Sequence, residues 1–309
     1  MATASSLPPG IVERIVDALG VVTRPAEALI TPMEAGSSGD RVWHVHTRDG
    51  IPDAVARWAP SAPGGSDDER SVGTTALRLA SEGGLTVPAV LHDERQRDGR
   101  LTIVAFCDGE TLAGRLARAP DEAEHWGAAC GDVLARLHAA HLDVSALPSW
   151  SAAWAMPPTA AARASVHATF EGTRQSMLHL DLHPFNVIVR DSEVSGVIDW
   201  ANARRGPALL DLARTHSLVE FIGRLTSTPA SPGSALAPDL LPRFGRALHD
   251  AYVARSAPID DARWAVARAW AFAVLEADIR PKAGHVDYVT PDVLAWISRR
   301  REEAQAAAR

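Results

Sequence analysis

The most informative part of the sequence is His179–Asn186, HLDLHPFN, followed by the apolar run VIV and, after a polar turn, by Val197–Trp200, VIDW. Three polar side chains with chelating oxygens, Asp181, Asn186 and Asp199, come at the ends of these short apolar strands. Strand ends hold side chains rigidly and leave their tips open to a cleft. Phosphoryl transfer needs one carboxylate to orient an incoming hydroxyl and oxygen ligands for Mg²⁺. The pattern therefore favours a phosphoryl-transfer site.

The rest of the chain predicts a β-rich part followed by a helical part. β-formers, turn residues and acidic helix starts predict strands at 41–47, 53–58, 88–92 and 101–106 and a helix at 67–80. Short strands are expected at 177–180, 187–189 and 194–198, and helices from 121 to 141 and at 208–224, 239–255, 260–279 and 290–307. We therefore predict an α+β, bilobal fold with a small N-terminal lobe, 1–107, a larger helical lobe, 108–309, and a cleft between them.

Composition narrows the class of protein. The 309 residues are 46% hydrophobic and 22% charged, which is typical of a globular chain. With 31 basic and 38 acidic residues the net charge is −7, which argues against nucleic-acid binding and mildly favours cationic ligands. Two cysteines, Cys107 and Cys130, fit a reducing compartment, and no stretch resembles a signal peptide or approaches the about 18 apolar residues of a membrane span. We expect a cytoplasmic protein without a nucleic-acid or membrane partner; monomer and homodimer both stay open.

The combined motifs resemble a known family. HLDLHPFNVIV and GVIDW are similar to the H-G-D-L-H-P-G-N and G-[VIL]-I-D-W signature of the aminoglycoside phosphotransferase and choline kinase family, which has a protein-kinase-like fold. Leu134–His138, LARLH, and Gly206–Ala213, GPALLDLA, match two further family segments, so the similarity runs from about residue 30 to 225. The resemblance implies ATP- and Mg²⁺-dependent transfer of the γ-phosphoryl group to a hydroxyl of a small molecule. A cationic aminoglycoside or another amino-alcohol is the leading acceptor.

The resemblance also implies roles for single residues. Asp181 would be the catalytic base or hydroxyl-orienting carboxylate, with His179 beside it in the catalytic loop, and Asn186 and Asp199 would bind Mg²⁺. Hydrogen bonding within the loop is the default role of both His179 and His183. The His-x-Asp-x-His spacing also suits zinc, so a metallohydrolase is a less favoured alternative.

Two positions depart from the family pattern. Leu180 and Phe185 stand where the family usually has glycine. Both substitutions bear on the backbone freedom of the catalytic loop, and Phe185 would narrow or line the acceptor pocket. A nucleotide-binding homologue with weak catalysis is therefore a second alternative.

The nucleotide is expected to bind the N-terminal lobe. A loop between two β segments resembles the family's phosphate-binding loop, since glycines let backbone N–H groups approach phosphates and serines add donors. A later segment resembles the hinge whose backbone would hydrogen-bond adenine. The loop residues are Gly36, Ser37, Ser38 and Gly39, and the hinge residues are Val104, Phe106 and Cys107.

The cation that contacts the phosphates must be an arginine. Lys282 is the only lysine and lies far downstream, whereas Arg57 fits the V-L-R variant of the family's third strand. The planar guanidinium can contact two phosphate oxygens. Glu69, in the following helix, is the candidate acid that orients it, although the resemblance places the family glutamate at Val72.

Overall fold

The computed structural model describes residues 14–15, 18, 29–33, 40–46, 53–60, 67–151, 159–228, 231 and 233–308, with the side chains of 29, 67–70 and 161 left aside. Within these ranges, no helix combines the length and the apolar character that a membrane crossing requires.

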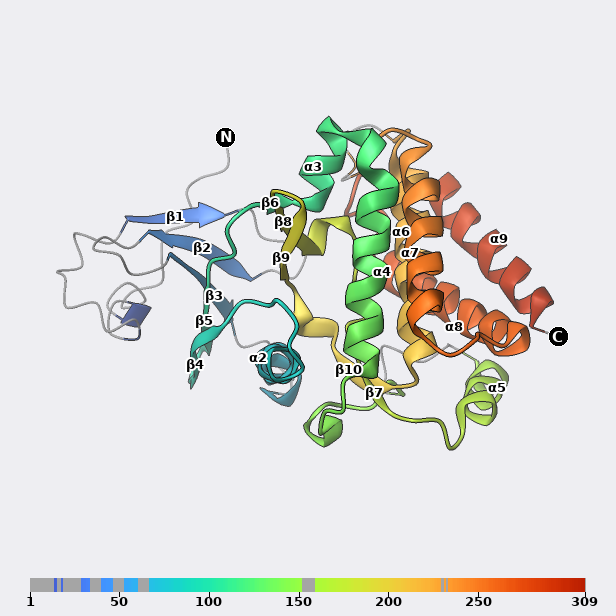
Figure 1. Ribbon diagram of the computed structural model, residues 1–309, viewed down its shortest axis with the longest axis horizontal. Coiled ribbons are helices and arrows are strands. Elements are labelled where there is room, and N and C mark those ends of the chain that lie inside the picture. The colour runs from blue at the N-terminus through green and yellow to red at the C-terminus, as the bar shows by residue number, and fades with distance from the viewer. Residues whose placement is uncertain are drawn as a thin grey trace.

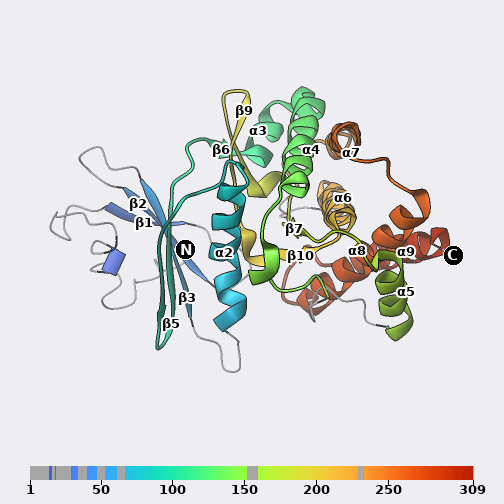
Figure 2. The ribbon, with the colours of Figure 1, turned by 60° about the horizontal axis from the view of Figure 1, so that its bottom comes forward.

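The N-terminal part is a five-stranded antiparallel sheet in the order β1-β2-β3-β5-β4. One face carries a core of Trp43, Trp58, Leu101 and Ile103, because alternate residues of each strand share a face. Helix α2 (Asp67–Glu82) lies between the sheet and the helical part in both ribbon views (Figures 1 and 2). The strands are β1 (Leu29–Met33), β2 (Arg41–His46), β3 (Ala54–Pro60), β4 (Val90–Gln96) and β5 (Gly99–Ala105).

The second predicted hairpin is longer than the sequence indicated. The sequence predicted strands only at 88–92 and 101–106 here, but β4 continues to Gln96, and only Arg97 and Asp98 form the turn. β4 is an edge strand of the sheet, so its polar side chains can face solvent while its backbone stays paired with β5.

The C-terminal part is mostly helical, and this confirms the predicted α+β, bilobal, protein-kinase-like fold (Figure 1). The four helices predicted after residue 200 agree with the structure to within two residues at either end, whereas α3 and α5 were not predicted. The lobe boundary at 107/108 stays a prediction. The helices are α3 (Leu112–Arg118), α4 (Ala123–Ala139), α5 (Ala160–Phe170), α6 (Ala208–Leu225), α7 (Leu240–Arg255), α8 (Asp261–Ile279) and α9 (Pro291–Ala307).

Helices α4 and α7 pack with their backbones unusually close. A Cβ at Gly127 or Gly131 of α4 would lie 2.3 Å from a carbonyl oxygen of α7, at Phe244 and Leu248 respectively. Only glycine fits this contact, since real Cβ atoms do not approach backbone that closely. The pairing fixes the end of α4, where His138 lies 3.1 Å from Asp211 of α6.

Short elements carry the chemistry-bearing residues between α5 and α6. The expected strand 177–180 ends at Leu178, because Leu180 has a left-handed backbone with φ of 61°. A Cβ at Gly73 of α2 would lie 3.7 Å from the Ala201 nitrogen, so α2 packs directly on the turn that follows Asp199. The elements are β7 (Ser176–Leu178), β8 (Val187–Arg190), β9 (Glu193–Val197), β10 (Arg204–Gly206) and the 3₁₀ turns Pro184–Asn186 and Trp200–Asn202. β8 also pairs with β6 (Glu110–Thr111), which lies before α3.

Candidate active site

The loop His179–Asn186, which is the predicted catalytic loop, is held in place by a buried carboxylate. Asp211, near the start of α6, accepts the backbone N–H groups of His179 and Leu180, each at 2.7 Å. His138 Nε2 lies 3.1 Å from Asp211 Oδ2, and the Tyr252 hydroxyl lies 2.9 Å from His138 Nδ1. Burial, together with the Asp211 charge, raises the pKa of Tyr252. Residues from α4, α6 and α7 therefore hold the loop in one place.

Leu180 keeps the backbone conformation that glycine would take. Its φ is 61°, and its side chain is fully buried against a cluster that includes Trp150 and Trp270. The left-handed region costs a non-glycine residue about 1–2 kcal/mol. The hydrogen bond from Leu180 N–H to Asp211 and the burial of the side chain offset that cost. The departure from the family glycine thus leaves the loop in place.

His179 has a positioning geometry. It is buried, its Nε2 lies 3.1 Å from the Ile198 carbonyl oxygen, and its Nδ1 accepts the backbone N–H of Asp181 at 3.2 Å. Burial lowers the pKa of His179, which keeps the ring neutral. Both ring nitrogens are hydrogen-bonded to backbone groups, so His179 offers no nitrogen to a metal. The ring ties the catalytic loop to the residue before Asp199.

Asn186 is oriented by three acceptors. Its Nδ2 donates to the Asp181 carbonyl oxygen at 2.9 Å and lies 3.2 Å from Asp181 Oδ2 and 3.3 Å from His183 Nε2. The Ile198 N–H donates to the Asn186 carbonyl at 3.0 Å, which places Asn186 beside the end of β9. With Nδ2 committed to these acceptors, Oδ1 is the side-chain atom that remains for a ligand.

Asp181 is a carboxyl group in a strongly electrostatic environment. Burial raises its pKa, the Arg214 charge opposes this, and the neighbouring Asp199 and Asp278 charges add to the increase. Arg214 is itself buried, donates to the Leu180 carbonyl at 3.4 Å and pairs with Asp278. Asp278, from α8, is thereby held close enough to affect the Asp181 carboxyl group.

Asp199 follows β9 with φ of 61° and faces the sheet across the site. Its side chain is 45% exposed, and its Oδ1 lies 3.7 Å from Arg57 Nη1. Arg57, 36% exposed on β3, also donates from Nε to Asp40 Oδ2 at 2.6 Å and pairs with it through a second nitrogen. Arg57 therefore lies between a sheet carboxylate and a catalytic-segment carboxylate. Sequence reasoning missed Asp40, although its place directly after the expected phosphate loop could have suggested it.

The structure does not describe several of the residues that were predicted to bind the nucleotide. The loop residues Gly36, Ser37, Ser38 and Gly39 lie outside the described residues, and so does the side chain of Glu69. Val72, the alternative position for that glutamate, is buried in the core between α2 and the helical part. Among the described side chains, the carboxylates paired with Arg57 are Asp40 and Asp199.

The predicted hinge residues lie at the end of β5 and just after it, next to β9. Val104 is part of β5 and is paired with Val55, and the Phe106 N–H donates to the Asp53 carbonyl at 2.8 Å. A Cβ at Gly196 would lie 2.6 Å from Cys107 Sγ, so the hinge packs directly on β9. Burial raises the pKa of the Cys107 thiol, which identifies it as a packing residue rather than a nucleophile.

The donor set fits Mg²⁺. Asn186 Oδ1 and the Asp199 carboxylate are oxygen donors, and the main-chain bond between Ile198 and Asn186 holds their segments side by side. Mg²⁺ prefers such oxygen ligands and usually takes only one or two carboxylates from the protein. These residues therefore suit a magnesium–phosphate group better than zinc.

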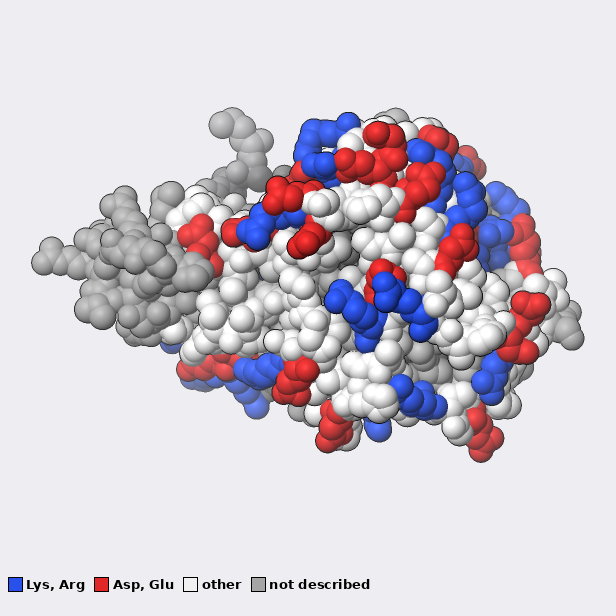
Figure 3. Space-filling model, in the orientation of Figure 1, with Lys and Arg blue, Asp and Glu red and all other residues white. Residues whose placement is uncertain are grey.

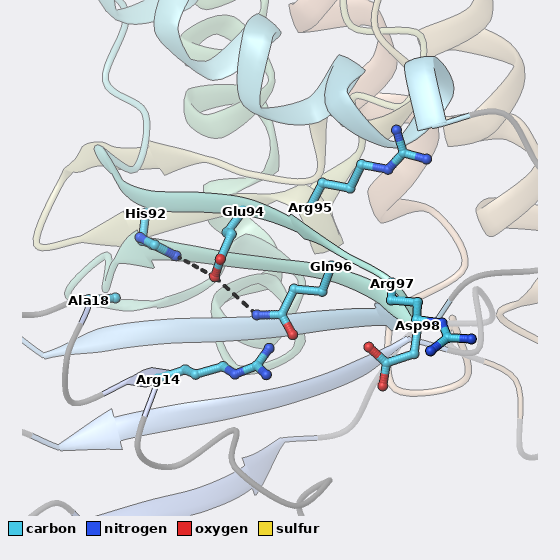
Figure 4. A pocket seen from close by; sticks show the side chains of 8 residues that line it. All are labelled: Arg14, Ala18, His92, Glu94, Arg95, Gln96, Arg97 and Asp98. Atoms are coloured by element: carbon cyan, nitrogen blue, oxygen red, sulfur yellow. Dashed lines mark hydrogen bonds and ion pairs between the residues drawn. The ribbon is translucent and has the colours of Figure 1, made fainter.

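Hollows elsewhere on the surface do not contain these residues. The one in Figure 4 lies over β4, where His92, Glu94 and Gln96 interact across the outer face of the strand. Another lies between α6, α7 and α8 and includes His216 and Trp264. On the face shown in Figure 3, acidic and basic side chains are interspersed rather than gathered into a basic patch.

Comparison with known proteins identifies the family. Three solved structures share the fold: a putative aminoglycoside phosphotransferase from Ralstonia eutropha JMP134 (12% identity, 97% of this chain and 96% of that one, TM-score 0.59), a thermostable mutant of aminoglycoside phosphotransferase APH(4)-Ia (16%, 96% and 99%, 0.58) and aminoglycoside-3'-phosphotransferase of type VIII (20%, 84% and 98%, 0.53). A search of curated proteins finds no match. Residues 30–219 match the model of the phosphotransferase enzyme family, APH, and the chain belongs to that family.

Proposed function

We propose that this protein is an ATP- and Mg²⁺-dependent kinase that transfers the γ-phosphoryl group to a hydroxyl of a small molecule. The observation that carries the proposal is that Asp181 and Asn186 share a braced loop and that Asp199 follows the segment bonded to Asn186, with Arg57 3.7 Å from Asp199. Phosphoryl transfer asks for positioning and charge neutralisation more than for covalent work by the protein. This site supplies both.

The nucleotide would bind between the sheet and the catalytic segment. Arg57 would exchange its contact with Asp199 for phosphate oxygens, which its planar fork suits. Asn186 and Asp199 would hold Mg²⁺, which when bound neutralises charge on the phosphates. Gly36, Ser37, Ser38 and Gly39 would donate to phosphates, and the backbone of Val104, Phe106 and Cys107 would line the adenine site. Glu69 stays a proposed further partner of Arg57.

Asp181 is the proposed catalytic residue. Its carboxylate would accept a hydrogen bond from the acceptor hydroxyl, orient the oxygen towards the γ-phosphorus and receive the proton as transfer proceeds. The raised pKa of Asp181 makes it a better proton acceptor than an exposed aspartate. His179 acts through the loop as a positioning residue, since both of its ring nitrogens bond to backbone groups.

The acceptor is proposed to be a hydroxylated, cationic small molecule. One APH(4)-Ia structure is a ternary complex with ADP and hygromycin B, and another structure of this fold is a macrolide 2'-phosphotransferase from Brachybacterium faecium (16% identity, 97% of this chain and 98% of that one, TM-score 0.50). The net charge of −7 and the Asp278 carboxylate near Asp181 favour an amino-sugar or amino-alcohol. Phosphorylation of an aminoglycoside in the cytoplasm would confer antibiotic resistance. The zinc hydrolase alternative loses support because His179 has no free ring nitrogen.

An acceptor screen tests the proposal. The protein is incubated with MgATP and a panel of aminoglycosides, amino-alcohols and macrolides, and mass spectrometry detects addition of one phosphoryl group. Asp181→Asn should lower kcat by about 10²–10⁴-fold while ATP still binds, since general-base contributions have that size. ATP binding without product on any acceptor would instead support a non-catalytic nucleotide-binding homologue.

A further inference from the structure

Three side chains outside the proposed active site converge on one face of the sheet. His44 and His46 are two residues apart on β2 and therefore share a face, and Asp53 directly precedes β3, whose Ala54 is paired with Val45. His46 Nδ1 forms a hydrogen bond with Asp53 Oδ2 at 3.0 Å, and His44 Nε2 lies 2.9 Å from the same oxygen. All three ligand atoms lie within 4.8 Å of one another.

The orientation of His44 points to a shared ligand rather than to a simple hydrogen bond. Its Nε2 is buried and, within the described part of the chain, has no hydrogen-bond partner, although Asp53 Oδ2 is only 2.9 Å away. The nitrogen is close to the carboxylate but is not aimed at it. Metal ligands have this relation, because each lone pair points at the ion and neighbouring ligands meet off-axis.

The spacing also fits a small transition-metal ion. Zinc binds imidazole nitrogen at about 2.0–2.1 Å and carboxylate oxygen at about 2.0–2.2 Å, so tetrahedral ligand atoms lie about 3.3 Å apart. The two measured nitrogen–oxygen distances, 2.9 and 3.0 Å, need only a small expansion to reach that value. Two imidazoles and one carboxylate form a borderline-soft donor set that suits Zn²⁺ rather than Mg²⁺.

We propose that His44, His46 and Asp53 form a binding site for one divalent transition-metal ion of the zinc class, with one coordination position left open. The site is separate from the proposed magnesium site, because Arg57 lies four residues along β3, about 13 Å away at strand spacing. The His44 ring stacks on Phe106 at 4.2 Å, and Phe106 N–H donates to the Asp53 carbonyl. A bound ion would therefore tie the end of β2 and the residue before β3 to the hinge.

Metal titration of the full chain tests this site. Zn²⁺ and Co²⁺ are titrated without nucleotide, which would chelate them, and with excess Mg²⁺ to occupy oxygen-only sites. Binding is followed by calorimetry and by the Co²⁺ absorption spectrum. We expect one ion per chain, a raised Tm, and at least a 10–100-fold loss of affinity in His44→Gln and in His46→Gln, since even indirect ligand partners contribute that much. His141→Gln, an exposed histidine on another loop, should bind as the wild type does.

Two outcomes would overturn the site: no saturable binding of one equivalent by the wild type, or unchanged affinity in both histidine variants. Asp53→Asn, which keeps side-chain size, provides a third variant, and circular dichroism with EDTA checks that each variant folds. The readouts are metal stoichiometry and affinity. The inference therefore stands or fails independently of phosphoryl transfer.

Discussion

The two sides of the proposed active site are built differently. On the catalytic side, Asp211 is fully buried and bonds to two backbone N–H groups, and His138 and Tyr252 continue the network. On the nucleotide side, Arg57 is 36% exposed and is held by charge pairs with Asp40 and Asp199. Buried hydrogen bonds fix the residues that must meet the reacting atoms, whereas a half-exposed ion pair can exchange partners when a polyanion arrives.

This contrast predicts the largest combined effect on stability and turnover at Asp211. In Asp211→Asn, one carboxylate oxygen becomes an NH₂ group that faces a backbone N–H, so buried donors lose their acceptor. Each unsatisfied buried group costs about 1–3 kcal/mol, and we expect about 3 kcal/mol of lost stability together with a lower kcat.

Urea unfolding and steady-state kinetics measure both effects. Asp143→Asn is the matched control, because Asp143 also accepts a backbone N–H but is exposed, and asparagine caps as well as aspartate does. If Asp211→Asn and the control were equally stable, the buried hydrogen bonds of Asp211 would not stabilise the loop as predicted.

A change at Arg57 should affect the nucleotide and spare the fold. Arg57→Met should raise KM for ATP by about 10-fold or more, since a charge-assisted phosphate contact contributes about 1.5–3 kcal/mol. Stability should fall by no more than about 1 kcal/mol, because the pairs of Arg57 are partly exposed. The KM for ATP of Arg57→Lys should lie between those of the wild type and Arg57→Met, since lysine keeps the charge but lacks the planar fork of arginine. An unchanged KM for ATP in Arg57→Met would exclude Arg57 from the phosphate site.

The pH dependence of stability sharpens the contrast. Burial lowers the pKa of His183 to about 4, so His183 is neutral in the native loop while the unfolded chain takes up a proton below about 6.5. The contribution of neutral His183 to the free energy of unfolding is present above pH 6.5. It is lost as the pH falls towards 4, by up to about 1.4 kcal/mol per pH unit. Urea unfolding between pH 7.5 and 5 should show a shallower slope in His183→Gln, and parallel curves would contradict this.

The smallest expected effect concerns the left-handed residue of the loop. Leu180→Ala and Leu180→Gly both lose buried side-chain contacts, but glycine should be about 1 kcal/mol more stable than alanine, since it tolerates φ of 61°. The matched pair is Leu178→Ala and Leu178→Gly on β7, where the strand favours alanine. The same order at both positions, read from urea midpoints, would refute the strained backbone.

The sequence predicted the elements whose signal is local. Apolar periodicity located the four helices after residue 200, and the motif around Asp181 and Asn186 indicated the proposed site, because these patterns depend on residues close in the chain. The unpredicted helix α5 has a weak amphipathic pattern, and its Ala-rich sequence gives little period to detect. The β4 extension depends on its being an edge strand, which only the assembled sheet decides.

The partners of the site residues were harder to predict. Asp40 and Arg57 are 17 positions apart, and Arg214 and Asp278 are 64 apart, so no local pattern joins them. The close approach of His44, His46 and Asp53 depends on the register between β2 and β3. Leu180 shows the opposite case, in which the residue type argues against a left-handed backbone and the buried Asp211 holds it there.

Asn186 and Asp199 are proposed to share one divalent ion beside a bound triphosphate. Mn²⁺ titrated into the complex with a non-hydrolysable ATP analogue, and followed by the electron paramagnetic resonance signal of free Mn²⁺, tests it directly. Asp199→Ala and Asn186→Ala should each weaken Mn²⁺ binding by at least about 10-fold, since each removes an oxygen ligand, while Asp181→Asn leaves it nearly unchanged. Wild-type Mn²⁺ affinity in both ligand variants would contradict the shared site.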